Sequence, residues 1–302
     1  MSLTSAMYTG TSGLLSQAQA ISTIGNNLAN TNTVGYKSAS TLFADLLYQT
    51  AGNNAQIGTG VKVDSVNTNF TEGSLASSTN VTDLAIQGSG FFALCGPGST
   101  SATAATAYYA RAGSFKLDSS GLGLVNSDGY KVLGADGNAI VFASTYTPAG
   151  GTALNFQKVS GVDSNGNISL LYADAAGNTA TVYYAGSAAG VGNAPVTTVA
   201  GGSVAIAEAT VANPDGLAKQ GDSLYKLTSA SGTTTGTPAA GMVFTTANGT
   251  SESMLSNYLE QSNVDMATEL VSMITTQRAY SANSKTITTA DQMTQEVLSL
   301  KQ

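Results

Sequence analysis

The chain lacks the residues on which most catalytic and metal-binding sites depend. Its 302 residues include no histidine, no tryptophan and a single cysteine, Cys95. A histidine-cysteine metal cluster, an intramolecular disulfide and a histidine-activated serine nucleophile are therefore all excluded. Cys95 follows the apolar run Phe91–Leu94, which predicts a buried and inert thiol. We expect no enzyme activity, no cofactor and no bound metal.

Charged residues are also scarce, and positive charge is the scarcer kind. Lysine and arginine number 11 against 18 aspartates and glutamates, so the net charge is -7. This balance argues against nucleic acid or an anionic membrane surface as a partner. No lysine or arginine precedes Lys37, and no apolar run is long enough for a signal-peptide core or a membrane span. We expect no membrane span, and either a cytoplasmic chain or export without a cleaved signal peptide.

The front of the chain has the pattern of an amphipathic helix. Apolar residues recur there in alternating steps of three and four, as in the seam of a coiled coil. Gly10 and Gln17 fall on the same stripe and weaken it. The positions expected to pack are Leu3, Met7, Leu14, Ile21, Ile24 and Leu28. A cluster of asparagines, threonines and Gly35 then predicts the end of the helix.

The back of the chain contains neither glycine nor proline after Gly249. This run predicts one long helix that ends at Leu300, with Ser262 as its N-cap and Asp265 as the capping-box partner. The positions expected to pack are Met266, Leu270, Met273, Ile274, Tyr280, Ile287, Met293 and Val297. Because both helical faces are narrow and polar in part, we expect other copies of the chain to complete them.

The middle of the chain reads as β structure. From about Leu75 to Gly249, short strand-like runs alternate with turns rich in aspartate and glycine. The predicted fold class is α+β, with paired, coiled-coil-like N- and C-terminal helices around a mainly antiparallel β domain. The expected domains are an N-terminal helix (1–33), an extended or β-hairpin connector (34–74), a β-rich domain (75–250) and a C-terminal helix (251–302).

Motifs at both ends and in the middle resemble the bacterial flagellar rod and hook proteins. The front carries Ile24–Asn30 and Thr33–Lys37, the middle carries Tyr109–Phe115, and the back carries Leu259–Asp265 and Gln277–Tyr280. The residues that match the family motifs at the two ends are Asn26, Asn27, Asn30, Gly35, Tyr36, Lys37, Gln277, Arg278 and Tyr280. Residues 145–205 carry no motif of this family.

The resemblance implies a structural subunit of the extracellular bacterial flagellum that self-assembles into a helical tube. In that family the two terminal helices of each subunit pair in the inner wall, and the β domain forms the outer layer. The implied partners are further copies of the chain, neighbouring rod, hook-cap and hook-filament junction proteins, and the type III export apparatus. Such helices can travel unfolded and fold where neighbours complete the interface.

The resemblance leaves two positions in the flagellum open. The run Arg278–Ile287 looks more like hook proteins, which form a flexible joint that transmits torque between rod and filament. The short segment after Thr50 agrees, since distal rod proteins usually carry a longer stretch there. The length of the chain and the segment Asp45–Thr50 favour instead a distal rod protein, the drive shaft of the basal body. We predict a hook subunit, with the distal rod protein as the alternative and a secreted β-rich adhesin as a remote one.

Overall fold

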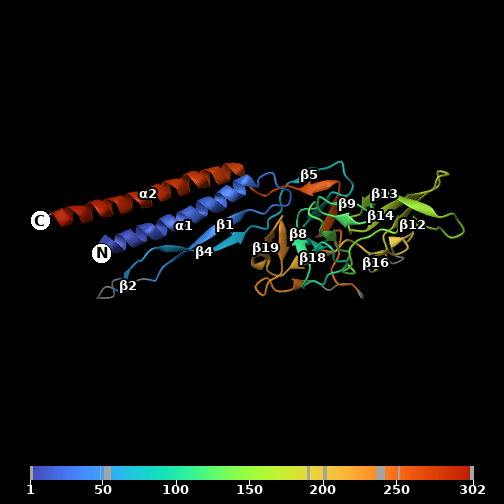
Figure 1. Cartoon of the computed structure of the whole chain (residues 1–302), viewed down its shortest axis with the longest axis horizontal. Helices are drawn as coiled ribbons and strands as arrows, with labels where there is room; N and C mark the ends of the chain where they lie inside the picture. Colours follow the sequence, from blue (N-terminus) through green and yellow to red (C-terminus); the bar gives the residue numbers. More distant parts are fainter. Residues whose placement is uncertain are drawn as a thin grey trace. The chain divides into compact units, whose positions relative to one another are not determined.

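The chain forms two compact units, each built from segments that are distant in sequence (Figure 1). The computed structural model describes residues 3–47, 49–50, 56–188, 191–199, 203–235, 242–250 and 252–299. The terminal unit comprises Met1–Asn32, Lys37–Asn69 and Val264–Gln302. The β unit comprises Thr33–Tyr36 and Phe70–Asn263. Helices at the two ends and a mainly antiparallel β region between them confirm the predicted α+β fold.

The terminal unit consists of two long helices and a β-hairpin. Helix α1 (Leu3–Ala29) and helix α2 (Met266–Ser299) lie side by side and run antiparallel (Figure 1). Strand β1 (Ala39–Asp45) pairs antiparallel with β4 (Val61–Thr68), and β2 (Gln49–Thr50) pairs with β3 (Gln56–Ile57). The hairpin β1–β4 packs against α1.

Helix α1 ends where its sequence changes to turn-forming residues. The Asn30 side chain donates to the Asn26 carbonyl at 2.9 Å, and the Thr31 hydroxyl donates to the Leu28 carbonyl at 2.6 Å. The Asn26 carbonyl also accepts from the Asn30 N–H, so the Asn30 and Thr31 side chains add to the hydrogen bonding of the last helical turn. The predicted end of the front helix is therefore confirmed, with its local cause.

Helix α2 begins at Met266, so the predicted N-cap at Ser262 is wrong. Asp265 is the cap: its Oδ1 accepts from the Ala267 N–H at 2.9 Å, and its Oδ2 accepts from the Thr268 hydroxyl at 2.8 Å. The hydrogen bonds from Thr268 and Ala267 also lower the pKa of Asp265. The residues before the cap stay extended because Asn263 donates to the Tyr36 and Thr71 carbonyls within the β unit. The predicted end at Leu300 lies outside the described residues.

The β unit is built from short antiparallel strands around two sheets. The larger sheet has the order β19-β20-β8-β7-β11-β10-β9, and β18 pairs with both β7 and β21. Its strands are β7 (Phe91–Cys95), β8 (Tyr108–Ala110), β9 (Lys116–Leu117), β10 (Leu124–Val125), β11 (Lys131–Val132), β18 (Glu208–Val211), β19 (Ala218–Gly221), β20 (Leu224–Lys226) and β21 (Thr234–Thr235). Cys95 is buried, as predicted.

The second sheet lies within residues 145–205, where the sequence resemblance supplied no motif. It has four strands, in the order β12 (Thr145–Tyr146), β13 (Leu154–Val162), β14 (Ile168–Ala173) and β15 (Thr179–Tyr183). Smaller pairs join β16 (Ser187–Ala188) to β17 (Val191–Gly192), β22 (Ser253–Ser256) to β6 (Leu84–Gln87), and β23 (Tyr258–Glu260) to β5 (Leu75–Ser77).

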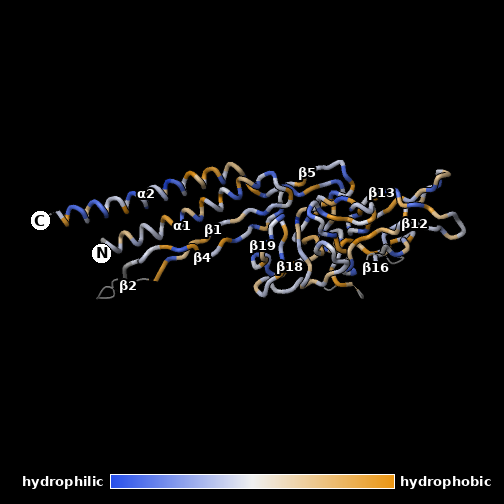
Figure 2. The backbone as a smooth tube through the Cα atoms, viewed as in Figure 1, coloured by the Kyte–Doolittle hydropathy of each residue, from blue (hydrophilic) through white to orange (hydrophobic). Residues whose placement is uncertain are grey.

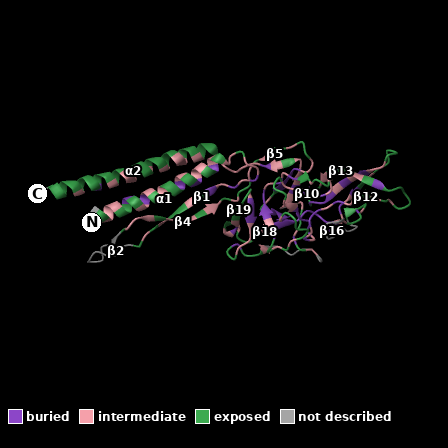
Figure 3. Ribbon diagram, viewed as in Figure 1, coloured by how far each residue is buried: buried purple, intermediate pink, exposed green. Residues whose placement is uncertain are grey.

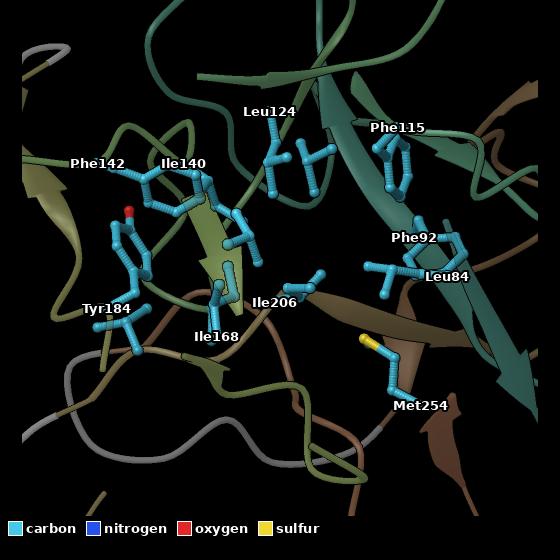
Figure 4. Packing of buried hydrophobic residues seen from close by; sticks show 14 of the residues in the cluster. Leu84, Phe92, Phe115, Leu124, Ile140, Phe142, Ile168, Tyr184, Ile206 and Met254 are labelled. Carbon is cyan, nitrogen blue, oxygen red and sulfur yellow. The ribbon is translucent and has the colours of Figure 1, made fainter. Parts of the chain in front are cut away.

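The two sheets share one hydrophobic core. Figure 4 shows part of it: Phe92 of β7 and Phe115, which precedes β9, belong to the same cluster as Ile140, Phe142 and Ile168. The rings of Phe92 and Phe115 meet edge to face with centroids 5.2 Å apart. Leu170 and Tyr172 of β14 are buried in the same cluster. The strands within residues 145–205 are therefore an integral part of the β unit.

Candidate assembly surface and buried polar sites

The two terminal helices approach each other through glycines. A Cβ atom at Gly10 would lie 2.8 Å from Ile287 Cγ1, and one at Gly13 would lie 2.6 Å from Asn283 Nδ2. Both distances are shorter than real Cβ contacts, so a larger residue at either position requires the facing side chain or the helices to shift. Gly10, which interrupts the apolar stripe in the sequence, is therefore a contact residue.

The hairpin side of α1 is held by small polar side chains. Ser16 donates to the Val61 carbonyl at 3.3 Å, and Thr41 donates to the Thr23 hydroxyl at 3.0 Å. Asn27 exchanges two hydrogen bonds with the backbone of Ala39, at 2.8 and 2.9 Å. Its amide nitrogen also lies 2.8 Å from Glu269 Oε1 on α2. Asn27 thus links α1 to both of its neighbours in the terminal unit.

Sequence reasoning missed this polar face. Ser12, Ser16, Thr23 and Asn27 recur at helical spacing, and Ser16, Thr23 and Asn27 are buried. In the sequence, this packed face could have been recognised from small polar residues spaced four and seven positions apart. It was overlooked because apolar periodicity was taken as the mark of the packed face.

The predicted packing residues whose side chains the structure describes are half-buried or exposed, and Ile287 faces Gly10 in the helix contact. Met7, Leu14, Ile21, Ile24, Leu28, Met273 and Ile287 are half-buried. Met266, Leu270, Ile274, Tyr280, Met293 and Val297 are exposed. The backbone of Leu3 belongs to α1, but its side chain lies outside the described residues. Figure 3 shows α2 exposed along most of its length, and Figure 2 shows apolar residues scattered on it.

The family-motif residues fall into three groups. Asn26 and Asn30 hydrogen-bond to each other at the end of α1, beside the buried Asn27. Lys37 is buried in the terminal unit, whereas Gly35 and Tyr36 belong to the β unit. Gln277, Arg278 and Tyr280 are exposed on α2.

A groove of about 670 Å³ lies between α1 and the hairpin. Its lining is mostly apolar and includes Leu15, Leu46, Val61, Val63 and Val66, with Ser12 and Gln19 among the polar residues. Leu15 is 69% exposed beside it. Together with the apolar residues of α2, this groove leaves the terminal unit with apolar surface that the unit itself does not cover.

Gly35 lies where only glycine fits. Its φ of +67° is in the left-handed region, and its N–H donates to the Glu260 carbonyl at 2.8 Å. A Cβ atom on Gly35 would lie 2.7 Å from Ala112 Cα. The motifs around Gly35, Ala112 and Glu260, taken from three distant parts of the sequence, therefore meet inside the β unit.

Arg111, from the motif in the middle of the chain, is a buried cation. Its Nη1 lies 3.4 Å from Glu260 Oε2, and both side chains are almost fully buried. Its Nη2 donates to the Gly88 carbonyl at 2.7 Å, and its guanidinium carbon lies 5.1 Å from the centre of the Phe91 ring. Glu260 Oε1 accepts from the Gly73 N–H at 2.9 Å. The ion pair thus fixes several strands of the β unit around one point.

The described helices include none that is long and apolar enough to cross a lipid bilayer. Among all the residues that the structure describes, no three histidine, cysteine, aspartate or glutamate side chains lie close enough to hold a metal ion.

Three family models match the chain, one near its N-terminus, one in the β region and one near its C-terminus. A model described as "Flagella basal body rod protein" matches residues 7–37, "Flagellar hook protein FlgE/F/G D1 domain" matches 85–170, and "Flagellar basal body rod FlgEFG protein C-terminal" matches 255–300. The "Flagellar basal-body rod protein FlgG" of Bacillus subtilis (strain 168) is 34% identical, over 98% of both chains. The chain belongs to the flagellar rod and hook protein family.

Two further relatives bear on the position within this family. The FlgG rod protein of Borreliella burgdorferi is 34% identical over 95% of both chains. The "Flagellar hook protein FlgE" of Brucella abortus is 44% identical, but over 45% of this chain and only 32% of its own length. Family membership confirms the resemblance of the terminal motifs, and with it a structural role in the flagellum. The comparisons favour the rod over the predicted hook.

Proposed function

We propose that the chain is the distal rod subunit of the flagellar basal body, the alternative to the predicted hook subunit. The observation that carries this proposal is the full-length match to rod proteins named FlgG, set against a hook protein that is matched over a third of its length. The run Arg278–Ile287 favoured the hook in the sequence, but it is only a short segment of α2.

Self-assembly into a homopolymer is supported by the apolar surface of the terminal unit. Met293 is 55% exposed, Val297 is 61% exposed and Ile274 is 51% exposed. Burying such a side chain completely contributes about 1.5–3 kcal/mol, so covering the exposed half of each contributes roughly 1 kcal/mol. Several contacts of this size, repeated around each subunit by the same head-to-tail operation, generate a helical tube.

Membership of the family supports the remaining parts of the proposal. The helices in 1–33 and 251–302 form the inner wall, the β-rich region 75–250 forms the outer layer, and the hairpin in 34–74 connects them. The chain reaches the growing flagellum through the flagellar export apparatus without a cleaved signal peptide. Its partners are its own copies and the adjoining rod and hook proteins.

Electron microscopy of basal bodies from a deletion strain tests the position in the flagellum. Loss of a distal rod subunit leaves a truncated rod that carries no hook, and expression of the full chain restores both. A complete rod that merely lacks its hook would overturn the proposal and restore the hook assignment. As a control, deletion of a known hook protein should give basal bodies with a complete rod and no hook.

A further inference from the structure

A carboxyl group without a donor lies inside the β unit. Glu208 is the first residue of β18, its backbone pairs with Phe92 of β7, and its side chain is completely buried. Neither carboxyl oxygen receives a hydrogen bond from an N–H or O–H group of the described residues. An ionised carboxylate in this position would pay the full cost of its desolvation.

The Glu208 carboxyl group lies in space that is free because residue 90 is a glycine. A Cβ atom on Gly90 would lie 2.6 Å from the Glu208 carboxyl carbon, so only glycine at position 90 accommodates the carboxyl group. Gly90 directly precedes the buried strand β7, and the three atoms nearest to its Cβ position all belong to Glu208. The buried carboxyl group is therefore built into the strand arrangement.

The charged groups that face Glu208 are Glu252 and Arg111. Arg111 is held in its ion pair with Glu260, 3.4 Å away, and by the Gly88 carbonyl. Glu252 Oε1 accepts hydrogen bonds from Ser89 Oγ at 3.2 Å and from Thr210 Oγ1 at 3.0 Å. Two hydroxyl groups thus donate to the Glu252 carboxyl group, whereas no N–H or O–H group of the described residues donates to that of Glu208.

We propose that Glu208 and Glu252 form a proton-sharing pair, in which Glu208 holds a proton taken from solvent and donates it to the Glu252 carboxylate. Ser89, next to Gly90, and Thr210, on the same strand as Glu208, hold Glu252 in hydrogen-bonding contact with Glu208. Two carboxylates in such contact require one proton between them. The step is a reversible protonation, so one proton leaves bulk water on folding and returns to it on unfolding.

A metal cation fits the same position poorly. A calcium ion takes 6–8 oxygen ligands, and the site offers two carboxyl groups beside an arginine. The proton is the occupant that satisfies both Glu208 and Glu252.

Burial, followed by the charge of Glu252, raises the pKa of Glu208 to about 8, and Arg111 opposes this shift. The folded protein then holds a proton at pH values where the unfolded chain, with an ordinary glutamate pKa near 4.5, has released it. Stability is highest below the unfolded pKa, falls as the pH rises from there to about 8, and is constant above. Because the chain has no histidine, few other side chains titrate in this window.

The test measures urea unfolding of the full chain from pH 5 to pH 9 for wild type, Glu208→Gln and Glu252→Gln. The exposed Glu72→Gln is the matched control. From pH 5 to pH 9, we expect the unfolding equilibrium constant of wild type to rise on the order of 1,000-fold more than that of Glu208→Gln. Glu72→Gln should show the same pH dependence as wild type. Glu252→Gln removes the neighbouring charge, so the fall in stability should end at a lower pH.

Infrared spectroscopy of the folded protein gives a second readout that does not depend on how well the variants fold. At pH 6, wild type should show the carbonyl band of a buried protonated carboxylic acid, and the band should disappear as the pH passes about 8. Absence of this band, identical pH profiles for wild type and Glu208→Gln, or stability that follows added calcium in place of pH would each overturn the proposal.

Discussion

Replacement of Gly35 by alanine tests whether the backbone conformation and the packing at this position require glycine. The new Cβ atom must occupy a left-handed backbone position and overlap the backbone of Ala112. The left-handed conformation costs about 1–2 kcal/mol in any L-residue. Forcing a methyl group into packed backbone costs about 1–3 kcal/mol more, and displacing the Gly35 N–H from the Glu260 carbonyl costs a further ~1 kcal/mol. The expected total for Gly35→Ala is about 3–6 kcal/mol.

Gly121→Ala is the matched control. Gly121 has a φ of +72°, close to that of Gly35, but nothing lies within 4 Å of the position of its Cβ atom. It carries the conformational cost alone, about 1–2 kcal/mol. In thermal unfolding followed by tyrosine fluorescence, Gly35→Ala should lower Tm by roughly 10 °C or more, and Gly121→Ala by a few degrees. Equal losses for the two variants would refute the reasoning, because the contact with Ala112 would then contribute nothing.

Two further predictions concern the buried ion pair and the helix contact. Arg111→Met should destabilise the protein by about 3–5 kcal/mol in urea unfolding, because Glu260 is left buried without its cation; removing both partners should cost less than the sum of the single changes. Gly13→Leu should separate the two helices and block polymerisation measured by sedimentation, since it collides with Asn283, whereas Gly25→Ala should polymerise normally because its Cβ position is empty. Normal assembly of Gly13→Leu, or additive single effects at Arg111 and Glu260, would contradict these statements.

Features that depend on local sequence could be predicted, and features that depend on distant partners could not. The end of α1 follows from side chains within four residues of the carbonyls they cap. The start of α2 was misplaced because hydrogen bonds from Asn263 to Tyr36 and Thr71 hold the preceding residues extended. No local pattern in the sequence contains these partners, so Ser262 was taken as the cap.

The buried polar groups illustrate the same limit. Arg111 and its partner Glu260 are 149 residues apart, and each looks like an ordinary surface charge in the sequence. The terminal motifs are shared by rod and hook proteins, so they could not distinguish the two positions in the flagellum. The full-length match to rod proteins favours the rod, whereas a short helical run had favoured the hook.

The most direct test of the assembly proposal is an electron cryomicroscopy reconstruction of the rod in basal bodies that contain this chain. We predict that α1 and α2 of each copy lie in the inner wall of a straight distal rod, with Met293 and Val297 covered by neighbouring copies. Density for the chain in a curved hook, or a tube wall in which these α2 residues face only solvent, would contradict the account.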